Sequence, residues 1–231
     1  MKLICDSLTC ERGGRRVFEN VTFQISSGEA LIVRGPNGVG KSSLLRVIAG
    51  LVAVRSGKMA LEGGIEDRTV PEHCHYFGHL DALKPSLTAL ENLSFWRSFY
   101  EPVELAGFSS DATLGASEAL ETLEIGHTAH LPAAFLSAGQ RRRLSLARLL
   151  VVPRPIWIMD EPSSALDAAS ERTLLGLMAS HINGGGIIIA ATHLPLDLPN
   201  TKYLEFSRGD GRDDEGLAED YDGFGDSGDF L

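Results

Sequence analysis

The sequence predicts an α/β protein with an antiparallel β part near its N-terminus and a helical insert in its middle. Short apolar runs bounded by Gly and Pro alternate with segments of helical periodicity, a layout typical of α/β sheet proteins. The chain has 231 residues, of which 43% are apolar and 23% are charged, as in ordinary globular proteins. We therefore expect one main domain that carries an insertion.

The first predicted elements come early in the chain. Residues 21–25 alternate apolar and polar side chains, which indicates an antiparallel strand. A turn at residues 26–29 leads into a buried strand, ALIVR, at residues 30–34. After a Gly-rich loop, residues 41–51 carry apolar side chains three and four apart, so we expect a helix there.

The helical insert and the rest of the sheet follow. Residues 80–136 are predicted to be helical, because LTALENLSFW and SEALETLEI space their apolar residues as a helix does. A further helix is expected over residues 141–150. Two buried strands complete the pattern, IWIM at residues 156–159 and IIIAA at residues 187–191.

The formal net charge of −10 is unevenly distributed. Residues 209–231 hold nine acids and one base, which leaves a net charge of −2 for residues 1–208. A segment rich in Gly and Asp has little to bury, so we predict an acidic, flexible tail over residues 208–231. The overall balance argues against a broad electrostatic grip on nucleic acid, and no nucleic-acid partner is expected.

Cysteine usage and hydropathy bear on the cellular setting. The three cysteines show no CxxC spacing, and MKLICDSL lacks the plan of a secretory signal, so we expect a reducing, cytoplasmic environment. No window approaches the roughly 18 uninterrupted apolar residues that a membrane-spanning helix needs. If the protein works at a membrane, we expect a partner to supply the membrane part.

One segment between a predicted strand and a predicted helix fits the phosphate-binding pattern GxxxxGK[ST]. Its glycines allow backbone N–H groups to turn toward a phosphate, and the helix N-terminus adds positive potential. We expect Lys41 to bridge the β- and γ-phosphates of a nucleotide and Ser42 to ligate Mg²⁺. The candidate nucleotide-binding residues here are Gly35, Pro36, Asn37, Gly38, Val39, Gly40, Lys41, Ser42 and Ser43.

Two adjacent acids, Asp160 and Glu161, follow the buried run IWIM. Ligands of parallel sheets gather at the carboxyl ends of the strands, where these side chains are expected. We expect Asp160 to hold the Mg²⁺ shell through water. Glu161 would orient and polarise the attacking water, as a catalytic base does.

The segment LSAGQ at residues 136–140 resembles the LSGGQ signature of ABC-type ATPases, with Ala138 in place of the first glycine. The Ser137 hydroxyl and the Gly139 N–H at a helix N-terminus can cap a γ-phosphate, with Gln140 completing the motif. In that family the cap belongs to the opposite subunit. The resemblance therefore implies a homodimer that holds two ATP molecules between its protomers.

Two further matches extend the resemblance over about residues 1–207. Asp167, in SALD, resembles the D-loop acid through which the two active sites sense each other. His193, in ATH, resembles the switch histidine, which would contact the γ-phosphate and hold the attacking water with Glu161. The resemblance implies a P-loop NTPase (ABC ATPase) domain, with a RecA-like core at residues 1–79 and 137–207 and a helical insert at about 80–136.

Two positions depart from the family pattern. Arg12 stands where an aromatic residue usually stacks on adenine, and since a guanidinium plane can also stack on a base, Arg12 stays a candidate adenine contact. Leu80 stands where the Gln of the Q-loop is expected, and leucine cannot ligate a metal. We hypothesise that water or the neighbouring His79 fills this gap.

Two clusters receive structural interpretations. The segment HCHYFGH at residues 73–79 contains residue types that bind metals or haem. Its spacing matches no recognised closed metal site, however, and the sequence offers no second pair of metal-binding residues. We interpret it as a strand and loop. The three arginines at residues 141–143 are interpreted as solvated or phosphate-facing residues of the helix that follows LSAGQ.

Three longer stretches are similar to the ATP-binding subunits of cytochrome c biogenesis, a family often called haem exporters: GHLDALKPSLTALENL, FLSAGQRRRLSLAR and ATHLPL. This resemblance implies ATP hydrolysis with Mg²⁺, peripherally on the cytoplasmic face of a bacterial inner membrane. The homodimer would bind integral membrane subunits, CcmB-like and CcmC-like, through its helical insert. Hydrolysis would serve haem handling in cytochrome c maturation and the release of a haem-loaded chaperone.

Three other functions are alternatives to this role in cytochrome c maturation. An ABC ATPase for another small solute or for lipid would keep every catalytic residue and change only the partner. A soluble ABC protein of DNA repair or translation usually has tandem ATPase domains or a long coiled-coil insertion, and this sequence has neither. A nucleotide-gated scaffold with little catalysis is suggested by Arg12 and Leu80.

Overall fold

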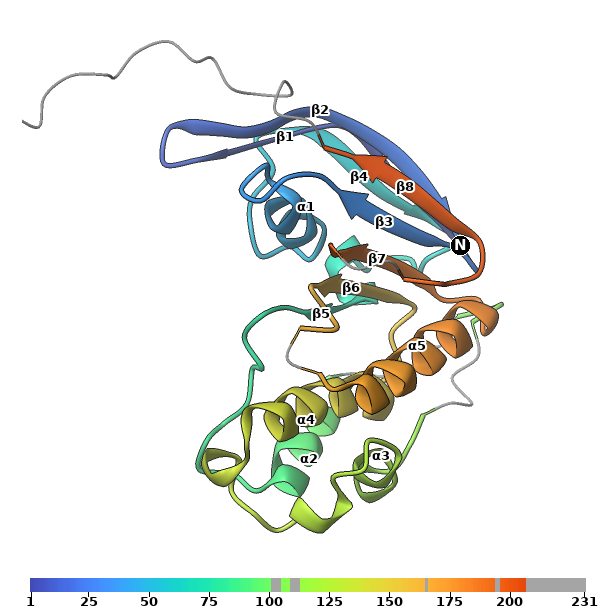
Figure 1. Ribbon diagram of the computed structural model, residues 1–231. Coiled ribbons are helices and arrows are strands. Elements are labelled where there is room, and N and C mark those ends of the chain that lie inside the picture. Colours follow the sequence, from blue (N-terminus) through green and yellow to red (C-terminus); the bar gives the residue numbers. More distant parts are fainter. Residues whose placement is uncertain (101–104, 109–112, 165, 194–195, 207–231) are drawn as a thin grey trace, which may run out of the picture.

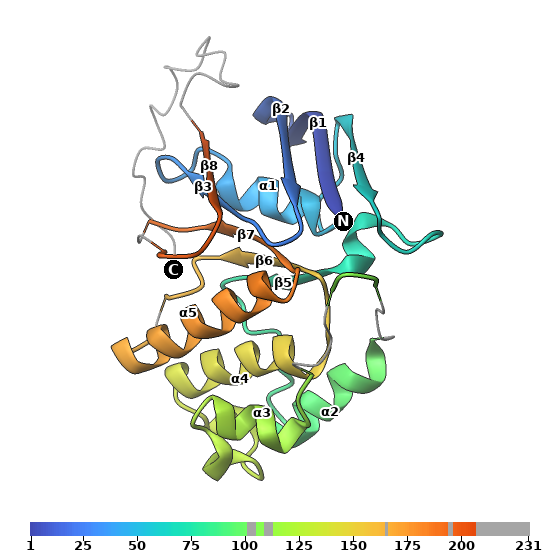
Figure 2. The same ribbon diagram turned by 90° about the vertical axis from the view of Figure 1, so that its right-hand side faces the viewer.

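The computed structural model describes residues 1–100, 105–108, 113–164, 166–193 and 196–206. These residues form two β-sheets and a layer of helices (Figure 1). Helix α1 (Lys41–Ile48) packs between the two sheets, and the other α-helices cover the far face of the larger sheet (Figures 1 and 2). The tail expected over residues 208–231 lies outside the described residues.

The smaller sheet is antiparallel, with the strand order β2-β1-β4. It consists of β1 (Lys2–Arg12), β2 (Arg15–Ser26) and β4 (Ser56–Glu62). The strand predicted over residues 21–25 is part of the longer β2, because a turn at Gly13 and Gly14, both with positive φ, lets β1 and β2 pair along their length. Register shifts between Cys5 and Glu11 interrupt the alternation in β1, so the sequence pattern does not reveal that strand.

The larger sheet is parallel, with the strand order β5-β6-β7-β3-β8. Its strands are β3 (Ala30–Arg34), β5 (Cys74–Phe77), β6 (Ile156–Asp160), β7 (Ile187–Ala191) and β8 (Thr201–Glu205). The buried strands predicted from ALIVR, IWIM and IIIAA are confirmed, and β6 runs one residue further, to Asp160. All five strands end at one edge, where ligands of parallel sheets bind.

The helical layer contains α2 (Ala89–Phe99), α3 (Ala116–Thr122), α4 (Ala138–Val151) and α5 (Ala168–Asn183), joined in part by the short 3₁₀ turns η2 (Gly126–Thr128) and η3 (Ala133–Phe135). Another turn, η1 (Val70–His73), precedes β5. Helix α1 ends at Ile48 rather than residue 51, because Gly50 takes a φ of 71° that stops the helix. No helix among the described residues is both long and apolar enough to cross a bilayer.

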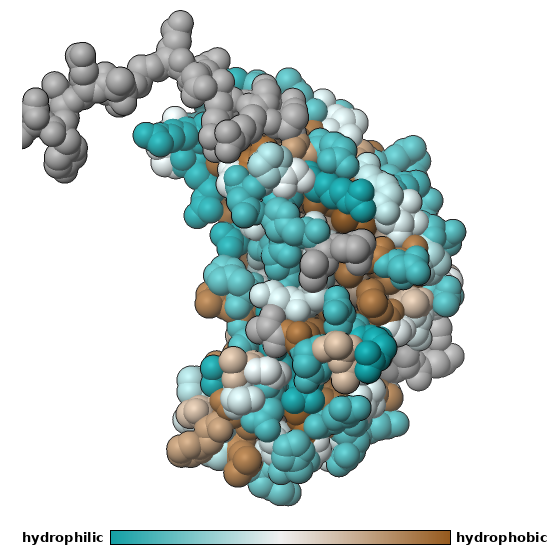
Figure 3. All heavy atoms as spheres, in the orientation of Figure 1, coloured by the Kyte–Doolittle hydropathy of each residue, from teal (hydrophilic) through white to brown (hydrophobic). Residues whose placement is uncertain are grey.

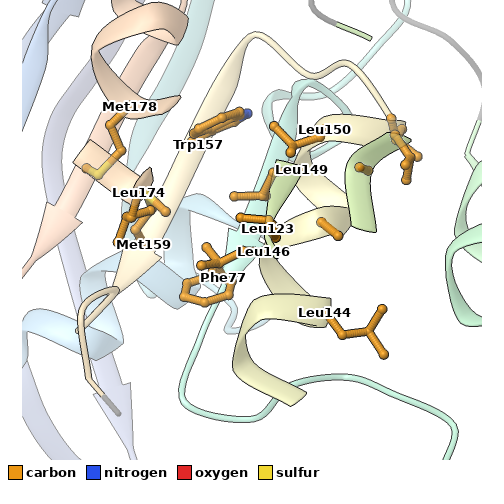
Figure 4. Packing of buried hydrophobic residues seen from close by; sticks show 14 of the residues in the cluster. Phe77, Leu123, Leu144, Leu146, Leu149, Leu150, Trp157, Met159, Leu174 and Met178 are labelled. Atoms are coloured by element: carbon orange, nitrogen blue, oxygen red, sulfur yellow. The ribbon is translucent and has the colours of Figure 1, made fainter. Parts of the chain in front are cut away.

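Side chains of the central strands alternate between two cores. In β6, Ile156 and Ile158 pack with α1 and the antiparallel sheet, whereas Trp157 and Met159 pack with the helical layer. Figure 4 shows Trp157 between Met178 of α5 and the leucines of α4, and Met159 beside Leu174 of α5. Because both faces of the strand are covered, its apolar run is unbroken.

Candidate nucleotide-binding site

The phosphate loop joins the end of β3 to the start of α1, and its path depends on glycine. Gly35, Gly38 and Gly40 have φ values of 141°, 75° and 115°, in a region that L side chains rarely adopt. A Cβ at Gly35 would overlap the Phe206 carbonyl oxygen, and one at Gly40 would lie 3.1 Å from Val17 Cγ1. Close packing therefore holds the loop at the N-terminus of α1, where helix N–H groups can receive an anion.

Lys41 is the first residue of α1 and is only 7% exposed. Its ammonium donates hydrogen bonds to the carbonyl oxygens of Gly35 (2.7 Å) and Pro36 (2.9 Å). These bonds keep the positive charge inside the curve of the loop, where it can pair with a phosphate. Ser43 is half-buried in the first turn of the same helix, and Val39 packs against the core.

Ser42 and Asp160 meet at the edge of the sheet although 118 residues separate them. The Ser42 hydroxyl donates to Asp160 Oδ1 at 2.9 Å, and the Tyr76 hydroxyl donates to Asp160 Oδ2 at 3.4 Å. Tyr76 in turn accepts a hydrogen bond from Arg46 Nε at 3.4 Å. A hydroxyl and a carboxylate oxygen in contact are hard oxygen ligands of the kind that Mg²⁺ prefers, so the pair fits this cation.

The described residues near this edge do not bind a metal ion through protein ligands alone. No group of three or more His, Cys, Asp or Glu side chains in the described part of the chain could hold a metal ion. Mg²⁺ usually keeps several water ligands and binds through one or two protein groups plus substrate phosphates. The pair formed by Ser42 and Asp160 matches that mode of binding.

Glu161 follows β6 and lies beside His193. His193 Nε2 is 3.5 Å from Glu161 Oε1 and 2.6 Å from Asn37 Oδ1, so the histidine connects the acid to the phosphate loop. Glu161 has a φ of 48°, which is uncommon for a residue with a side chain. Its N–H donates to the Ala191 carbonyl at 2.8 Å, which ties it to the end of β7.

The signature segment lies at the start of α4. Ser137 is the N-cap: its hydroxyl accepts from the Gln140 N–H at 3.2 Å, and the Gln140 side chain accepts from the Ser137 N–H at 2.9 Å. This capping box makes α4 begin at Ala138, three residues before the predicted start. Ser137 is exposed and Gly139 is half-buried, so the helix N-terminus faces outward.

The phosphate loop and the start of α4 lie on the same side of the molecule, at the left in Figure 1. Figure 3 shows, in the same orientation, that the outline is hollowed on this side between the two ends of the molecule. The phosphate loop and the start of α4 therefore lie apart within one chain.

Two other candidate residues lie apart from this group. Asp167 is the N-cap of α5, and its carboxylate accepts from the Ser170 N–H at 2.8 Å, a bond that lowers the pKa of Asp167 below its usual range. Arg12 is exposed at the end of β1, across the hairpin turn from Arg15. The roles expected of Asp167 between protomers and of Arg12 at adenine stay predictions.

The segment at residues 73–79 divides into buried and exposed parts. Both ring nitrogens of His73 are engaged, because Nε2 accepts from the Ile65 N–H and Nδ1 contacts the Thr69 carbonyl, each at 2.9 Å. His75 Nε2 contacts the Val152 carbonyl at 2.7 Å. His79 is exposed, as is Leu80, so neither position is fixed by packing.

Two residues near the site were missed or misread from sequence. Tyr76 contacts Asp160, but a lone tyrosine in a four-residue strand gives no pattern that predicts this. Arg142, interpreted from sequence as solvated or phosphate-facing, is buried and only 5% exposed. Helical periodicity could have shown this, since Arg142 lies on the same face of α4 as the buried residues Ser145, Leu146 and Leu149.

A cavity of about 680 Å³ lies elsewhere in the molecule. Its lining comes mostly from α4, α5 and the segments next to them, and includes Leu149, Trp157, Leu177 and His181. No residue of the phosphate loop lines it.

Comparison with known proteins places this geometry in context. Residues 18–164 match the family model described as ABC transporter. Two cytochrome c biogenesis ATP-binding export proteins CcmA, from Nitrobacter winogradskyi and Bradyrhizobium diazoefficiens, are each 54% identical over 198 residues, which is 86% of this chain and 94% of theirs. The protein of the same name from Chelativorans sp. is 48% identical over 212 residues, which is 90% of this chain and all of its own length.

Solved structures share the fold. A putative ABC transporter ATP-binding protein from Pyrococcus furiosus superposes with a TM-score of 0.72 at 22% identity, covering 89% of this chain and 98% of its own. The ATP-binding cassette MJ0796, solved as a dimer in a post-hydrolysis state with ADP and Pi, gives a TM-score of 0.71 at 24% identity over 89% and 97% of the two chains. These likenesses confirm the predicted fold class.

Proposed function

Because the chain belongs to the ABC transporter family of ATP-binding proteins, we propose that it hydrolyses ATP as a subunit of a membrane complex for cytochrome c biogenesis. The observation that carries the ATPase is the convergence of four side chains at one sheet edge. Ser42 contacts Asp160 at 2.9 Å, and His193 connects Glu161 to the phosphate loop. The relatives named as cytochrome c biogenesis export proteins, at about half identity over most of the chain, support the biological role.

Each group at the edge has a defined task in hydrolysis. The loop N–H groups and Lys41 bind the phosphates, and the buried ammonium exchanges its loop carbonyls for phosphate oxygens. Ser42 and Asp160 would hold Mg²⁺, which neutralises charge on the β- and γ-phosphates when bound. Gly35 and Gly40 allow the loop to pack against Phe206 and Val17, which holds its path around the phosphate position.

Glu161 and His193 act on the attacking water. The Glu161 carboxylate accepts a proton from the water while His193 fixes the direction of the carboxylate and reaches toward the γ-phosphate from the Asn37 side. Correct placement of these two groups matters because phosphoryl transfer depends mainly on positioning and charge.

A second copy of the chain completes the site. The start of α4 lies apart from the phosphate loop of its own chain (Figure 1), and Ser137, the N-cap of this helix, is exposed. In a homodimer with the two chains facing each other, Ser137 of one protomer caps the γ-phosphate held by Lys41 of the other. Asp167 then lies near the contact between the two sites.

In this proposal the chain lies peripherally on the cytoplasmic face of a bacterial inner membrane. Integral membrane subunits, CcmB-like and CcmC-like, supply the part that crosses the membrane. Affinity purification of the tagged chain from detergent-solubilised membranes, followed by mass spectrometry, identifies its partners. In cells that lack the gene, haem staining should show loss of c-type cytochromes, restored by the wild type but not by Lys41→Ala. Recovery of staining by Lys41→Ala, or partners from an unrelated transporter, would reject the cytochrome role.

The catalytic assignment has a direct test in Glu161→Gln. Glutamine keeps the size of the side chain but accepts a proton far less readily, so we expect ATP turnover to fall by about 100-fold or more. ATP binding should persist, and the variant should accumulate as a nucleotide-bound dimer in size-exclusion chromatography. A variant that hydrolyses ATP at the wild-type rate would refute the role of Glu161.

A further inference from the structure

Arg142 lies where α4 meets the segments that follow β5 and β6, and it has no role in the hydrolysis steps proposed above. It lies in α4, five positions after the helix cap Ser137, and its side chain is buried between α4 and the edge of the parallel sheet. Neighbouring Arg141 and Arg143 are only half-buried. A buried guanidinium has a high desolvation cost, so its partners are informative.

One side of the guanidinium contacts the segment that follows β5. Arg142 Nη1 donates to the Gly78 carbonyl, its guanidinium lies 3.8 Å from the centre of the Phe77 ring, and Asp81 Oδ1 is 3.7 Å away. Burial lowers the pKa of Arg142, and the nearby Asp81 carboxylate opposes that shift. An arginine side chain stays charged under such conditions, so the contact is a persistent ionic one.

The other side contacts the catalytic acid. Arg142 Nη2 donates to the Glu161 carbonyl at 3.0 Å, while the Glu161 N–H donates to Ala191. Both backbone groups of Glu161 are thereby held: the N–H bonds to β7, and the carbonyl accepts from Arg142 of α4 and also from the Ser164 N–H at 3.1 Å. A left-handed φ for a residue with a Cβ persists only where surrounding contacts determine it, and the Arg142 bond is one of the contacts that do so here.

The position of Leu80 makes this link significant. Leu80 is 73% exposed and lies between Gly78 and Asp81, both of which Arg142 contacts. A leucine there has no polar group to offer to the nucleotide site. Arg142 does supply a polar connection, because its guanidinium contacts Gly78 and Asp81 on one side and the Glu161 carbonyl on the other.

We propose that Arg142 is a positioning residue that couples the segment at residues 78–81 to the conformation of Glu161. The inference rests on the proposed ATPase function. This segment leads into α2, and its displacement moves Gly78 and Asp81. The Arg142 guanidinium then shifts, which weakens or strengthens the hydrogen bond that it donates to the Glu161 carbonyl. The Glu161 carboxylate then leaves or regains its place beside His193, so the rate of hydrolysis responds to the helical layer.

The test compares Arg142→Gln and Arg142→Lys with the wild type, with Arg172→Gln as a control that removes an exposed arginine from α5. ATP affinity is measured by fluorescent-nucleotide titration, kcat and KM by phosphate release, and folding by thermal unfolding. We expect Arg142→Gln to lower kcat by about tenfold or more while KM and ATP affinity change less than about threefold. Arg142→Lys, which reaches one carbonyl but not both, should recover part of kcat.

A second variant avoids the buried site. Asp81 is partly exposed, and Asp81→Asn removes only the charge that fixes the guanidinium. We expect it to lower kcat by a smaller factor without a change in ATP affinity. Adding Asp81→Asn to Arg142→Gln should cause little further loss, because both changes break the same link.

The outcomes separate this inference from the proposed function. If the wild type itself shows no ATP turnover, the proposed function fails. If the wild type hydrolyses ATP and both Arg142 variants keep wild-type kcat, only the positioning role fails. A loss of ATP affinity and thermal stability in parallel with kcat, with no recovery in Arg142→Lys, would also overturn it, because it indicates a purely structural role.

Discussion

His75 shows how a single buried side chain ties stability to pH. The residue is 1% exposed in β5, its Nε2 lies 2.7 Å from the Val152 carbonyl, and its ring meets Tyr100 edge to face. Burial, reinforced by the positive charge of Arg148, lowers the pKa of His75 to about 3. The fold therefore holds a neutral imidazole that is buried and bound to a backbone carbonyl through Nε2, as suits a structural residue.

This pKa shift predicts a loss of stability in mild acid. The unfolded chain takes up a proton at His75 near pH 6.5 and the folded chain does not, so acidification through that range favours unfolding. Between pH 7 and pH 5 the contribution of His75 to the free energy of unfolding should fall by about 2 kcal/mol. Urea denaturation at both pH values measures this change. The free energy of unfolding should fall less for His75→Gln, whose amide can still donate to the Val152 carbonyl, than for the wild type. Equal falls in the two proteins would contradict the lowered pKa of His75.

Some residues of the candidate site could be predicted from the sequence, and others could not. Lys41, Ser42 and Asp160 carry recognisable patterns, and the structure places them together. Arg142 and Tyr76 do not, because their importance arises from partners 19 to 84 positions away in the chain. The misreading of Arg142 came from treating three consecutive arginines as one exposed cluster, although a helix directs consecutive side chains to different faces.

At the scale of elements, the loop between β3 and α1 is limited by backbone geometry. Gly35 and Gly38 both have positive φ, but a Cβ at Gly38 would meet open space and one at Gly35 would meet the Phe206 carbonyl after β8. Alanine at Gly38 therefore meets only the cost of a left-handed φ, whereas alanine at Gly35 meets a steric overlap as well as its own φ of 141°.

Alanine at each position provides a matched comparison. Gly38→Ala should lower the free energy of unfolding by about 1 kcal/mol, the cost of a left-handed backbone for alanine. Gly35→Ala should lower it by about 3 kcal/mol, because the end of β8 must also move to relieve the overlap. Guanidinium denaturation of both variants measures the difference, and equal losses would show that Phe206 yields without cost.

Element boundaries depended on caps and on pairing more than on periodicity. The central strands were predictable because burial on both faces leaves an unbroken apolar run. The start of α4 was placed three residues late, since the Ser137 capping box lies inside LSAGQ and resembles a loop. Strands β1 and β4 were not predicted, because the pairing that stabilises them joins residues far apart in the sequence.

At the scale of the whole molecule, the proposed homodimer follows from the separation of the phosphate loop and the start of α4 within one chain. Each site of the proposed homodimer takes its phosphate loop from one protomer and its signature segment from the other. A chain altered only at Lys41 can therefore still contribute an intact signature segment to its partner's site. A chain altered only at Ser137 can still contribute an intact phosphate loop.

Mixing the two defective chains tests this arrangement. Lys41→Ala alone and Ser137→Arg alone should each abolish ATP turnover, because both sites of either homodimer carry the lesion. In an equimolar mixture half of the dimers are mixed, and each mixed dimer has one site with both lesions and one intact site, so activity should return to about a quarter of the wild-type value. A Lys41→Ala, Ser137→Arg double variant mixed with either single variant leaves no intact site and should stay inactive. Phosphate release after co-refolding or subunit exchange measures the recovery, and a mixture no more active than its components would contradict the shared site.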